Sequence, residues 1–358
     1  MIRRIGAAEG AGGAAAEGAG GGSGRTLPPT GVDGTLVSCF GAAMAGYLER
    51  TGRDWLPVIG SGAGLSLKPM GGGRYVFRHL PAGLRADGAP LDLVRAGADD
   101  PAAALAGIEA ELGARGAVIV CADAFGLPWT PAHGRRHGAH WIVVDAAWHV
   151  TDVFEATAEA GQDRPWSGWT DRETLAGWAR ATPRLDPVAR LQERHAFGDD
   201  GDEAGSGTEA GDADQAGDAD FGPRGMENAT FQWFRRRRPD EPAPRPCGDG
   251  WLSGATALRE LAAHFEAHGA RPQAYCQAEE LWMAARQHQL HLRFAEKSGL
   301  GADRLRAAGE TAELWGRVPM VAFYARRSAD RPGGAKTGPL IDLLRQLADL
   351  SEARDRAS

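Results

Sequence analysis

Three short apolar segments constrain the fold more than any other feature of this chain. Residues 117–122 are apolar throughout, and the segments 140–144 and 149–154 are separated by only four residues. A short apolar run is typical of a strand inside a sheet, and so tight a turn predicts two antiparallel neighbours. Before them, residues 39–50 carry apolar side chains at helical spacing, and a Thr-Gly pair predicts the end of that helix. The sequence therefore predicts an α+β fold for this part of the chain.

Further helical patterns occur before and after these strands. Asp100 and Pro101 predict the start of a helix, and Thr170 is a suitable N-cap for a helix over 171–180. The glycine-rich segment 55–77 predicts loops and a hairpin. Four helical segments follow residue 250, at 253–268, 272–297, 301–326 and 340–353. Helices of that length predict a bundle or a helical cap.

Composition predicts four parts. They are a disordered leader at 1–26, an α+β domain at 27–185, an acidic, Arg- and Pro-rich linker or insertion at 186–249, and a helical domain at 250–358. Residues 199–220 hold nine acidic side chains and no basic one, whereas the whole chain has a net charge of -7. The rest of the chain is therefore nearly neutral, which argues against nucleic acid as a partner.

The composition also bears on location. No run of about eighteen apolar residues occurs, so no membrane span or membrane partner is expected. The first 24 residues lack the apolar core of a secretion signal. The four cysteines (39, 121, 247 and 276) are scattered without CxxC or metal-ligand spacing. We therefore expect a soluble cytoplasmic protein with reduced thiols.

Cys39 is the candidate nucleophile. It opens the predicted helix 39–50, and a thiol at a helix N-terminus has a lowered pKa because of the positive end of the helix dipole. A nearby imidazole would lower that pKa further and carry protons in acyl transfer. A lone cysteine is more often a small buried residue, and it is the histidine and aspartate downstream that favour catalysis.

His140 is the candidate proton carrier, because it begins an apolar strand that would hold its imidazole rigidly. His133 and His137 lie in the preceding loop and are alternatives, either solvated or attractive to an anionic substrate. No acidic or cysteine neighbours complete a metal site from the three, so no metal is expected.

Asp152 is the candidate partner of the histidine. If the turn before residue 149 joins antiparallel strands, Asp152 could hold the imidazole tautomer of His140 and stabilise its cation. Asp145 is more simply a turn former. Asp123, at the end of the strand 117–122, is either a third acid in the cleft or a strand-end cap.

Two other motifs fit weaker hypotheses. The glycines of 60–64 and 71–73 match neither phosphate-loop pattern, so no nucleotide cofactor is expected. The four arginines at 235–238 are either a solvated part of the linker or a docking site for an acidic carrier protein, with Trp233 as an anchor.

Several stretches, taken in order, resemble the family named for the butirosin biosynthesis protein H. They are Val37–Ala43, Val118–Trp129 and Gly138–Val144, with a similar C-terminal part from Leu292–Phe294 through Ala312–Trp315. The resemblance covers about residues 30–185 and 250–355. It implies a papain-like cysteine-protease fold followed by an α-helical domain.

The resemblance also implies an acyltransferase of antibiotic biosynthesis. Cys39 would accept an acyl or aminoacyl group from the phosphopantetheine thioester of an acyl or peptidyl carrier protein, and a small-molecule amine would receive it. Phosphopantetheine would enter only as part of that substrate, with no resident cofactor. His140 would shuttle protons and Asp152 would orient it.

One residue departs from the papain pattern. Asp33 stands six residues before the cysteine, where papain-type enzymes often carry a glutamine that donates to the oxyanion. An ionised carboxylate would repel an oxyanion, so the Cys39 N–H and another donor would have to serve, or the site is not hydrolytic. A cysteine peptidase or thioesterase with the same three residues is the first alternative. A non-catalytic binding protein of the same fold is the second.

Overall fold

A computed structural model describes residues 31–71, 73–78, 85–86, 89–91, 93–158, 161–179, 231–237, 250–329, 331 and 335–357. Every element below belongs to one compact unit, Val32–Ser358. The predicted leader at 1–26 and the acidic run at 199–220 lie outside the described residues. The fold is mixed α+β, as predicted.

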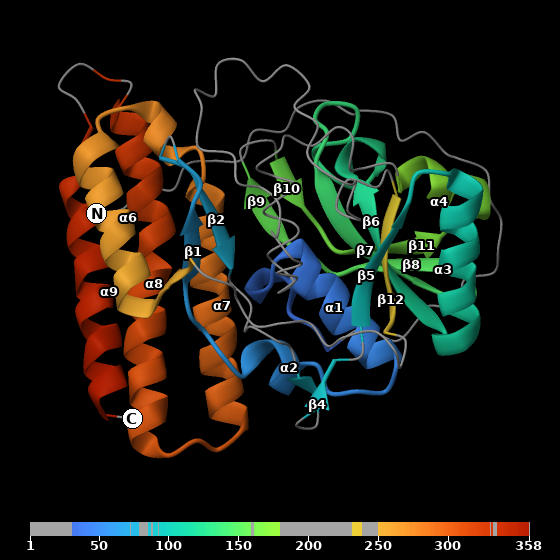
Figure 1. The fold of residues 1–358 in the computed structure, drawn as a ribbon, viewed down its shortest axis with the longest axis horizontal. Coiled ribbons are helices and arrows are strands. Elements are labelled where there is room, and N and C mark those ends of the chain that lie inside the picture. The colour runs from blue at the N-terminus through green and yellow to red at the C-terminus, as the bar shows by residue number, and fades with distance from the viewer. Residues whose placement is uncertain are drawn as a thin grey trace, which may run out of the picture. The chain divides into compact units, whose positions relative to one another are not determined.

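A six-stranded antiparallel sheet forms one half of this unit, with the order β11-β8-β7-β6-β12-β5 (Figure 1). Its strands are β5 (Leu93–Ala98), β6 (Ala117–Asp123), β7 (Ala139–Asp145), β8 (His149–Asp152), β11 (Trp166–Trp169) and β12 (Phe231–Arg236). Every residue of β6 is buried, which confirms the predicted interior strand. β7 and β8 are antiparallel neighbours, as the tight turn between them predicts.

Helices cover both faces of this sheet. The side chains of β7 alternate, so Trp141 and Val143 pack with α1 (Cys39–Arg50). Ile142 and Val144 point the other way, into a second core formed with α3 (Pro101–Arg115) and α4 (Arg172–Trp178). The strand β7 is therefore buried on both faces, and α1 has a fixed place against it.

Local capping sets the ends of these helices. α1 spans the predicted residues, because the Ser38 side chain caps its start and Gly52, at φ 74°, follows its end. Asp100 caps α3 as predicted. The cap of α4 is Asp171, which accepts from the Thr174 N–H, so the expectation for Thr170 was wrong by one residue.

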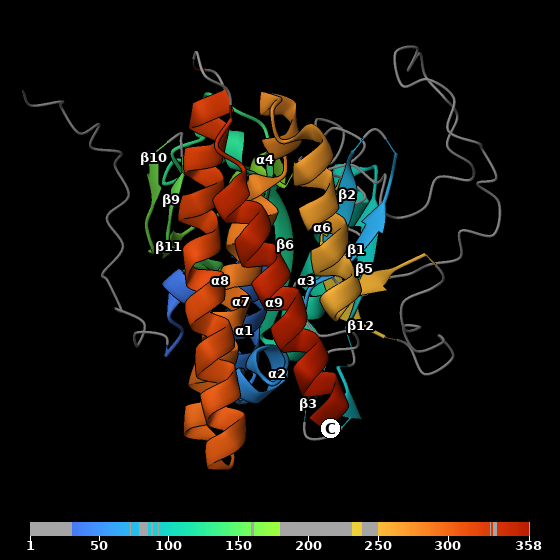
Figure 2. The same ribbon diagram turned by 90° about the vertical axis from the view of Figure 1, so that its left-hand side faces the viewer.

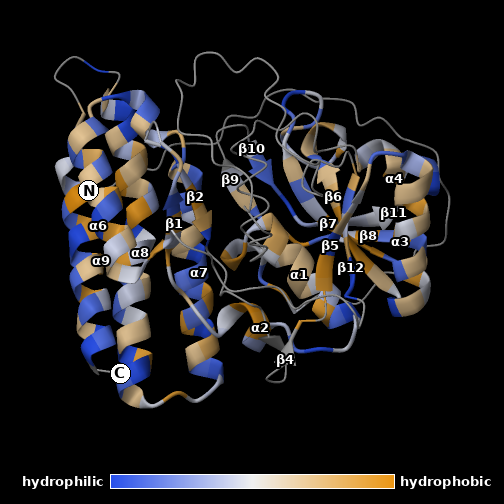
Figure 3. Cartoon of the chain, viewed as in Figure 1, coloured by the Kyte–Doolittle hydropathy of each residue, from blue (hydrophilic) through white to orange (hydrophobic). Residues whose placement is uncertain are grey.

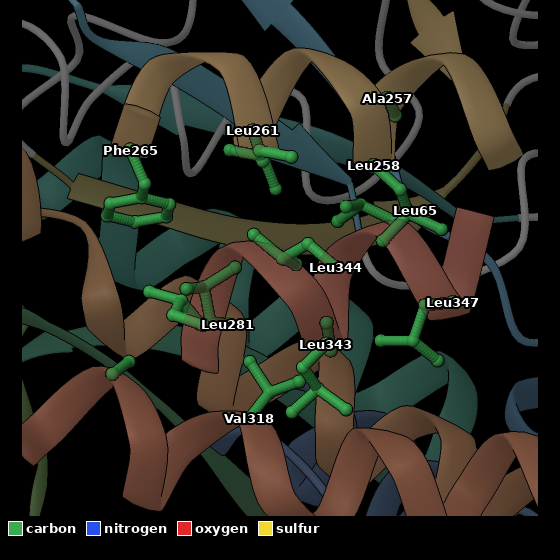
Figure 4. Packing of buried hydrophobic residues seen from close by; sticks show 14 of the residues in the cluster. Leu65, Ala257, Leu258, Leu261, Phe265, Leu281, Val318, Leu343, Leu344 and Leu347 are labelled. Carbon is green, nitrogen blue, oxygen red and sulfur yellow. The ribbon is translucent and has the colours of Figure 1, made fainter. Parts of the chain in front are cut away.

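Four long helices and one short 3-10 helix form the other half of the unit. They are α6 (Gly254–His268), η6 (Pro272–Tyr275), α7 (Ala278–Lys297), α8 (Ala302–Ala329) and α9 (Gly338–Ala357). Figure 2 shows α6, α8 and α9 side by side, and Figure 4 shows leucines of α6 and α9 meeting Val318 of α8 in one core. Figure 3 shows hydrophilic and hydrophobic stripes along α9, typical of a helix with one buried face. None of the helices in the described ranges is both long and apolar enough to cross a membrane.

A small sheet joins the N-terminal part of the chain to this bundle. The predicted hairpin is β1 (Ser66–Pro69) and β2 (Tyr75–Arg78), and β13 (Leu252–Ser253) pairs with β1. Leu67 and Phe77 of the hairpin belong to the bundle core. Residues assigned by composition to the α+β domain thus complete the core of the helical part.

The strand β12 corrects the predicted linker at 186–249. Residues 231–236 lie between β5 and β6, where Trp233 is buried instead of serving as a surface anchor. A Cβ at Gly107 of α3 would lie 2.3 Å from the Trp233 ring, so a glycine there lets the indole fit. Arg235 and Arg236 end this strand and are not part of a solvated linker.

Seven short elements complete the fold of the described residues. They are η1 (Gly34–Leu36), α2 (Leu56–Gly60), β3 (Arg85–Ala86), β4 (Ala89–Pro90), η2 (Ala124–Gly126), β9 (Ala156–Ala158) and β10 (Gly161–Asp163). α7 contacts both η1 and α2. Leu281 of α7 packs in the bundle core and Leu290 packs in the core with α1, so α7 joins the two halves.

Candidate active site

Cys39 is the first residue of α1 and is partly buried. The Oγ of Ser38 accepts a hydrogen bond from the Gly41 N–H at 3.0 Å, which fixes the first turn. The positive end of the helix dipole at this position favours a thiolate over a thiol. The thiol therefore has the setting that the sequence predicted for a nucleophile.

His140 and Asp152 form a buried pair. The distance from His140 Nε2 to Asp152 Oδ2 is 2.7 Å, and the two side chains are 7% and 3% exposed. They come together because β7 and β8 are antiparallel and each residue lies near the same end of the hairpin. The bond at Nε2 and the strand β7 together fix the orientation of the imidazole ring.

Three hydrogen bonds satisfy the Asp152 carboxylate. Oδ2 accepts from the Trp129 Nε1–H at 2.8 Å as well as bonding His140, and Oδ1 accepts from the Phe154 N–H at 3.0 Å. A buried carboxylate needs such donors, because burying an unpaired charge is costly. They also prevent the carboxylate from rotating away from the imidazole.

Trp129 was missed as a site residue by the sequence reasoning. Its ring stacks on Trp166 with centroids 3.9 Å apart and meets the edge of Trp178 at 5.3 Å. These contacts hold the indole so that its N–H reaches Asp152. No spacing rule could have found this bond, because Trp129 comes from the loop before β7.

The segment before Cys39 touches the segment after Asp152. The Glu155 N–H donates to the Gly34 carbonyl at 3.3 Å. A Cβ at Gly34 would lie 1.7 Å from the Val153 oxygen, so only glycine allows this approach. The two arms of the candidate site thus meet at one backbone junction.

Cys39 and His140 both contact one cluster of aromatic side chains. The Phe40 ring lies 5.8 Å from the Trp141 ring, and Cys39 packs against the cluster that contains both. Phe154 belongs to this cluster too, and its ring lies 5.8 Å from the His140 ring. The structure therefore joins His140 to Asp152 directly, and Cys39 packs against the same aromatic cluster that Phe154 belongs to.

Asp33 is engaged in its own contacts. Its Oδ1 accepts from the backbone and hydroxyl of Thr35, and its Oδ2 lies 3.0 Å from the NH1 of Arg293 in α7. Burial alone would raise the pKa of this carboxyl, but the Thr35 hydrogen bonds and the Arg293 charge hold it below its usual value. Asp33 therefore caps η1 and anchors α7.

The other predicted acids have partners of their own. Asp123 Oδ2 lies 2.7 Å from His137 Nδ1, and its Oδ1 accepts from the backbone of Phe125 and Gly138. Asp123 thus caps the strand end, as one of the two hypotheses predicted, and it also pairs with a loop histidine. Asp145 accepts from two N–H groups of its turn and pairs with Arg50, as expected for a turn former. His133 lies exposed in the loop.

α7 contributes residues that the sequence reasoning missed. The guanidinium of Arg286 lies 3.6 Å from the centre of the Trp282 ring and donates to the carbonyls of Gly34, Val37 and Glu155. Burial lowers the pKa of Arg286 to about 10, although nearby carboxylates oppose that shift. A signal existed in the sequence, because Arg286 interrupts the apolar stripe formed by Trp282, Leu290 and Phe294.

Asp163 is another acid near the pair that was not predicted. Burial raises its pKa, and the charges of His140, Asp152, Arg136 and Arg286 act on it. It is the last residue of β10 and pairs with Ala156, the first residue of β9.

No group of three or more His, Cys, Asp or Glu side chains in the described ranges is arranged to hold a metal ion. A cavity of about 350 Å³ lies elsewhere, between β2 and α6, and is lined by His264 and His268 among others. None of its lining residues belongs to the Cys39 region. The better candidate site is the His140–Asp152 pair together with the start of α1, because the Gly34 carbonyl, five residues before Cys39, accepts from the Glu155 N–H beyond Asp152.

No known protein family matches this chain, and no curated protein is detectably similar to it in sequence. The likeness to the butirosin biosynthesis protein H family therefore depends on the motifs alone. The geometry of the site carries the functional argument.

Proposed function

We propose that this protein is a cysteine-dependent acyltransferase with a papain-like site formed by Cys39, His140 and Asp152. The observation that carries the proposal is the buried His140–Asp152 pair, which shares a backbone junction with the helix that Cys39 opens. A nucleophile, a base and a residue that orients the base are the parts that acyl transfer at a thiolate needs.

In the first half-reaction, the Cys39 thiolate would attack the carbonyl carbon of a thioester on a carrier protein. The tetrahedral intermediate collapses to an acyl-Cys39 thioester, and the departing thiolate takes a proton from the His140 imidazolium. Asp152 stabilises that imidazolium through the bond at Nε2. In the second half-reaction an amine attacks acyl-Cys39, His140 accepts its proton, and the Cys39 thiolate leaves.

The burial of the site favours transfer to an amine over hydrolysis by water. Asp152 and His140 are almost completely buried, and the Trp129–Trp166 stack and Phe154 surround them. The proposal names the acyl donor as a thioester and the acceptor as an amine, and it specifies no particular compound.

Intact-mass spectrometry tests the first half-reaction. The protein is incubated with acyl and aminoacyl thioesters of N-acetylcysteamine, small analogues of the phosphopantetheine arm. Wild type should gain the mass of one acyl group, Cys39→Ala should gain none, and Cys276→Ser, which removes an exposed cysteine, should behave as wild type. An adduct that persists in Cys39→Ala, or no adduct and no thioester consumption over a broad panel, would contradict the proposal and favour a binding protein.

The second half-reaction separates transfer from hydrolysis. The acylated protein is isolated and mixed with a panel of primary amines, and both the amide product and the free acid are quantified. Amide formation that depends on the amine supports an acyltransferase. Release of free acid at the same rate with every amine identifies a thioesterase or peptidase instead.

A further inference from the structure

Arg286 of α7 touches both arms of the candidate site through the backbone. Its NH1 donates to the Gly34 carbonyl at 3.0 Å and to the Val37 carbonyl at 2.9 Å, just before Cys39. Its NH2 donates to the Glu155 carbonyl at 2.7 Å, three residues after Asp152. One guanidinium thus bridges the nucleophile arm and the arm that carries the carboxylate.

The two arms meet through a backbone hydrogen bond, which the Glu155 N–H donates to the Gly34 carbonyl. Gly34 accepts from both Arg286 and the Glu155 N–H, and its lack of a side chain is what allows this approach. Three carbonyls converge on one side chain, and a planar guanidinium is the side chain that can donate to all three at once. A lysine ammonium lacks that planar fork.

Contacts also run from Arg286 to the imidazole. The guanidinium lies 5.6 Å from the centre of the Phe154 ring, which in turn lies 5.8 Å from the His140 ring. On its other side the guanidinium stacks on Trp282 of its own helix. The side chain is therefore held in place by aromatic rings as well as by carbonyls.

We propose that Arg286 is a positioning residue that sets the placement of Cys39 relative to the His140–Asp152 pair. Through it, the helical half of the molecule controls the reactivity of the thiol. This inference rests on the proposed function, because it assumes that Cys39 is activated by that pair. It differs from a packing role in that it predicts a change in thiol chemistry in a protein that remains folded.

The test measures alkylation of Cys39 by iodoacetamide against pH, with the modified peptide quantified by mass spectrometry. In Arg286→Met the pH midpoint should rise towards about 8.5, the value of an unperturbed thiol. The rate of acyl transfer should fall about 100-fold, as expected when reacting groups shift by an ångström or so. Arg286→Lys keeps the positive charge and should show a smaller shift of the same sign.

Arg293→Gln is the matched control. Arg293 lies on the same helix and also reaches the segment before Cys39, but it binds the half-exposed side chain of Asp33 and no carbonyl. Its removal should change the rate by about twofold or less, as for a surface ion pair. Thermal melts establish whether each variant is folded. If Arg286→Met does not fold, Arg286→Lys tests the positioning role in its place.

The outcomes separate the two proposals. A folded Arg286 variant with the wild-type midpoint and rate overturns the positioning role while leaving the acyltransferase intact. If wild-type Cys39 reacts as an ordinary thiol, the proposed function fails. The positioning role of Arg286 is then tested by the imidazole NMR signals of His140. Signals that move in the Arg286 variant but not in Arg293→Gln support positioning, and unmoved signals overturn it.

Discussion

Two histidine–aspartate pairs lie at the same end of the sheet, and they differ in burial and not in distance. His140–Asp152 and His137–Asp123 are both 2.7 Å apart. The His140 side chain is 7% exposed, whereas the His137 side chain is 36% exposed. The first histidine is bonded at Nε2 from a strand, and the second at Nδ1 from a loop.

The carboxylates are much more alike than the histidines. Asp152 and Asp123 are both buried, and each accepts backbone N–H groups as well as its histidine. A short distance and a satisfied carboxylate therefore do not distinguish a catalytic pair from a loop anchor. The difference lies in what holds the imidazole, which is the strand and Phe154 for His140 and the exposed ring of Phe125 for His137.

Replacing each histidine by glutamine should have the largest effect and tests whether the buried pair is the catalytic one. His140→Gln removes the proton carrier, so the rate of acyl transfer should fall by about 10²–10⁴-fold. His137→Gln should change it by less than about threefold, because a solvated loop side chain contributes little to a reaction that it does not enter. Transfer rates with a thioester substrate measure both. A larger loss in His137→Gln would reverse the assignment.

Replacing the carboxylates separates stability from chemistry. Asp152→Asn and Asp123→Asn each weaken several hydrogen bonds to a buried charge, so each should lower the free energy of unfolding by roughly 1.5–3 kcal/mol. Urea denaturation measures that loss. Only Asp152→Asn should also slow acyl transfer, by about tenfold or more, since it alone orients the proton carrier. Equal rates in the two folded variants would contradict a catalytic role for Asp152.

The sequence predicted the His140–Asp152 pair because local rules determine it. A four-residue turn between two apolar strands leaves few registers, and both residues then fall near the open end of one hairpin. The start of α1 was predicted for a similar reason, since a serine cap and a Thr-Gly stop act within one turn. The three strands β6, β7 and β8 were predicted as short apolar runs, the long helices by their periodicity, and the hairpin β1–β2 by its glycines.

The parts that the sequence did not predict depend on residues far apart in the chain. β12 was assigned to a linker because it follows an acidic run, and its partners β5 and β6 precede it by more than a hundred residues. Arg286 lies 249 residues from its acceptor Val37. No periodicity connects such positions, so only tertiary packing reveals that a helix of the bundle reaches the cysteine arm.

A smaller effect is expected at the indole that supports the buried pair. Trp129→Phe removes the N–H that binds Asp152 but keeps a ring for the stack on Trp166. The lost bond to a charged acceptor should lower the unfolding free energy by about 1.5 kcal/mol and the transfer rate several-fold. Trp178→Phe is the control, because Trp178 only meets the ring of Trp129 at its edge. Equal effects of the two variants would show that packing, and not the hydrogen bond, matters here.

The smallest effect concerns the ring beside the exposed pair. The Phe125 ring is stacked on His137 with centroids 4.4 Å apart, but Phe125 is 36% exposed. Phe125→Leu should therefore lower the unfolding free energy by about 0.5 kcal/mol, the low end for an aromatic pair, and leave the transfer rate unchanged. Phe154→Leu, beside the buried pair, should lower it more, because Phe154 is 6% exposed and packs in the core with α1. If Phe125→Leu instead slowed transfer more than Phe154→Leu, the loop would belong to the substrate-binding surface, and the two pairs would divide binding and chemistry between them.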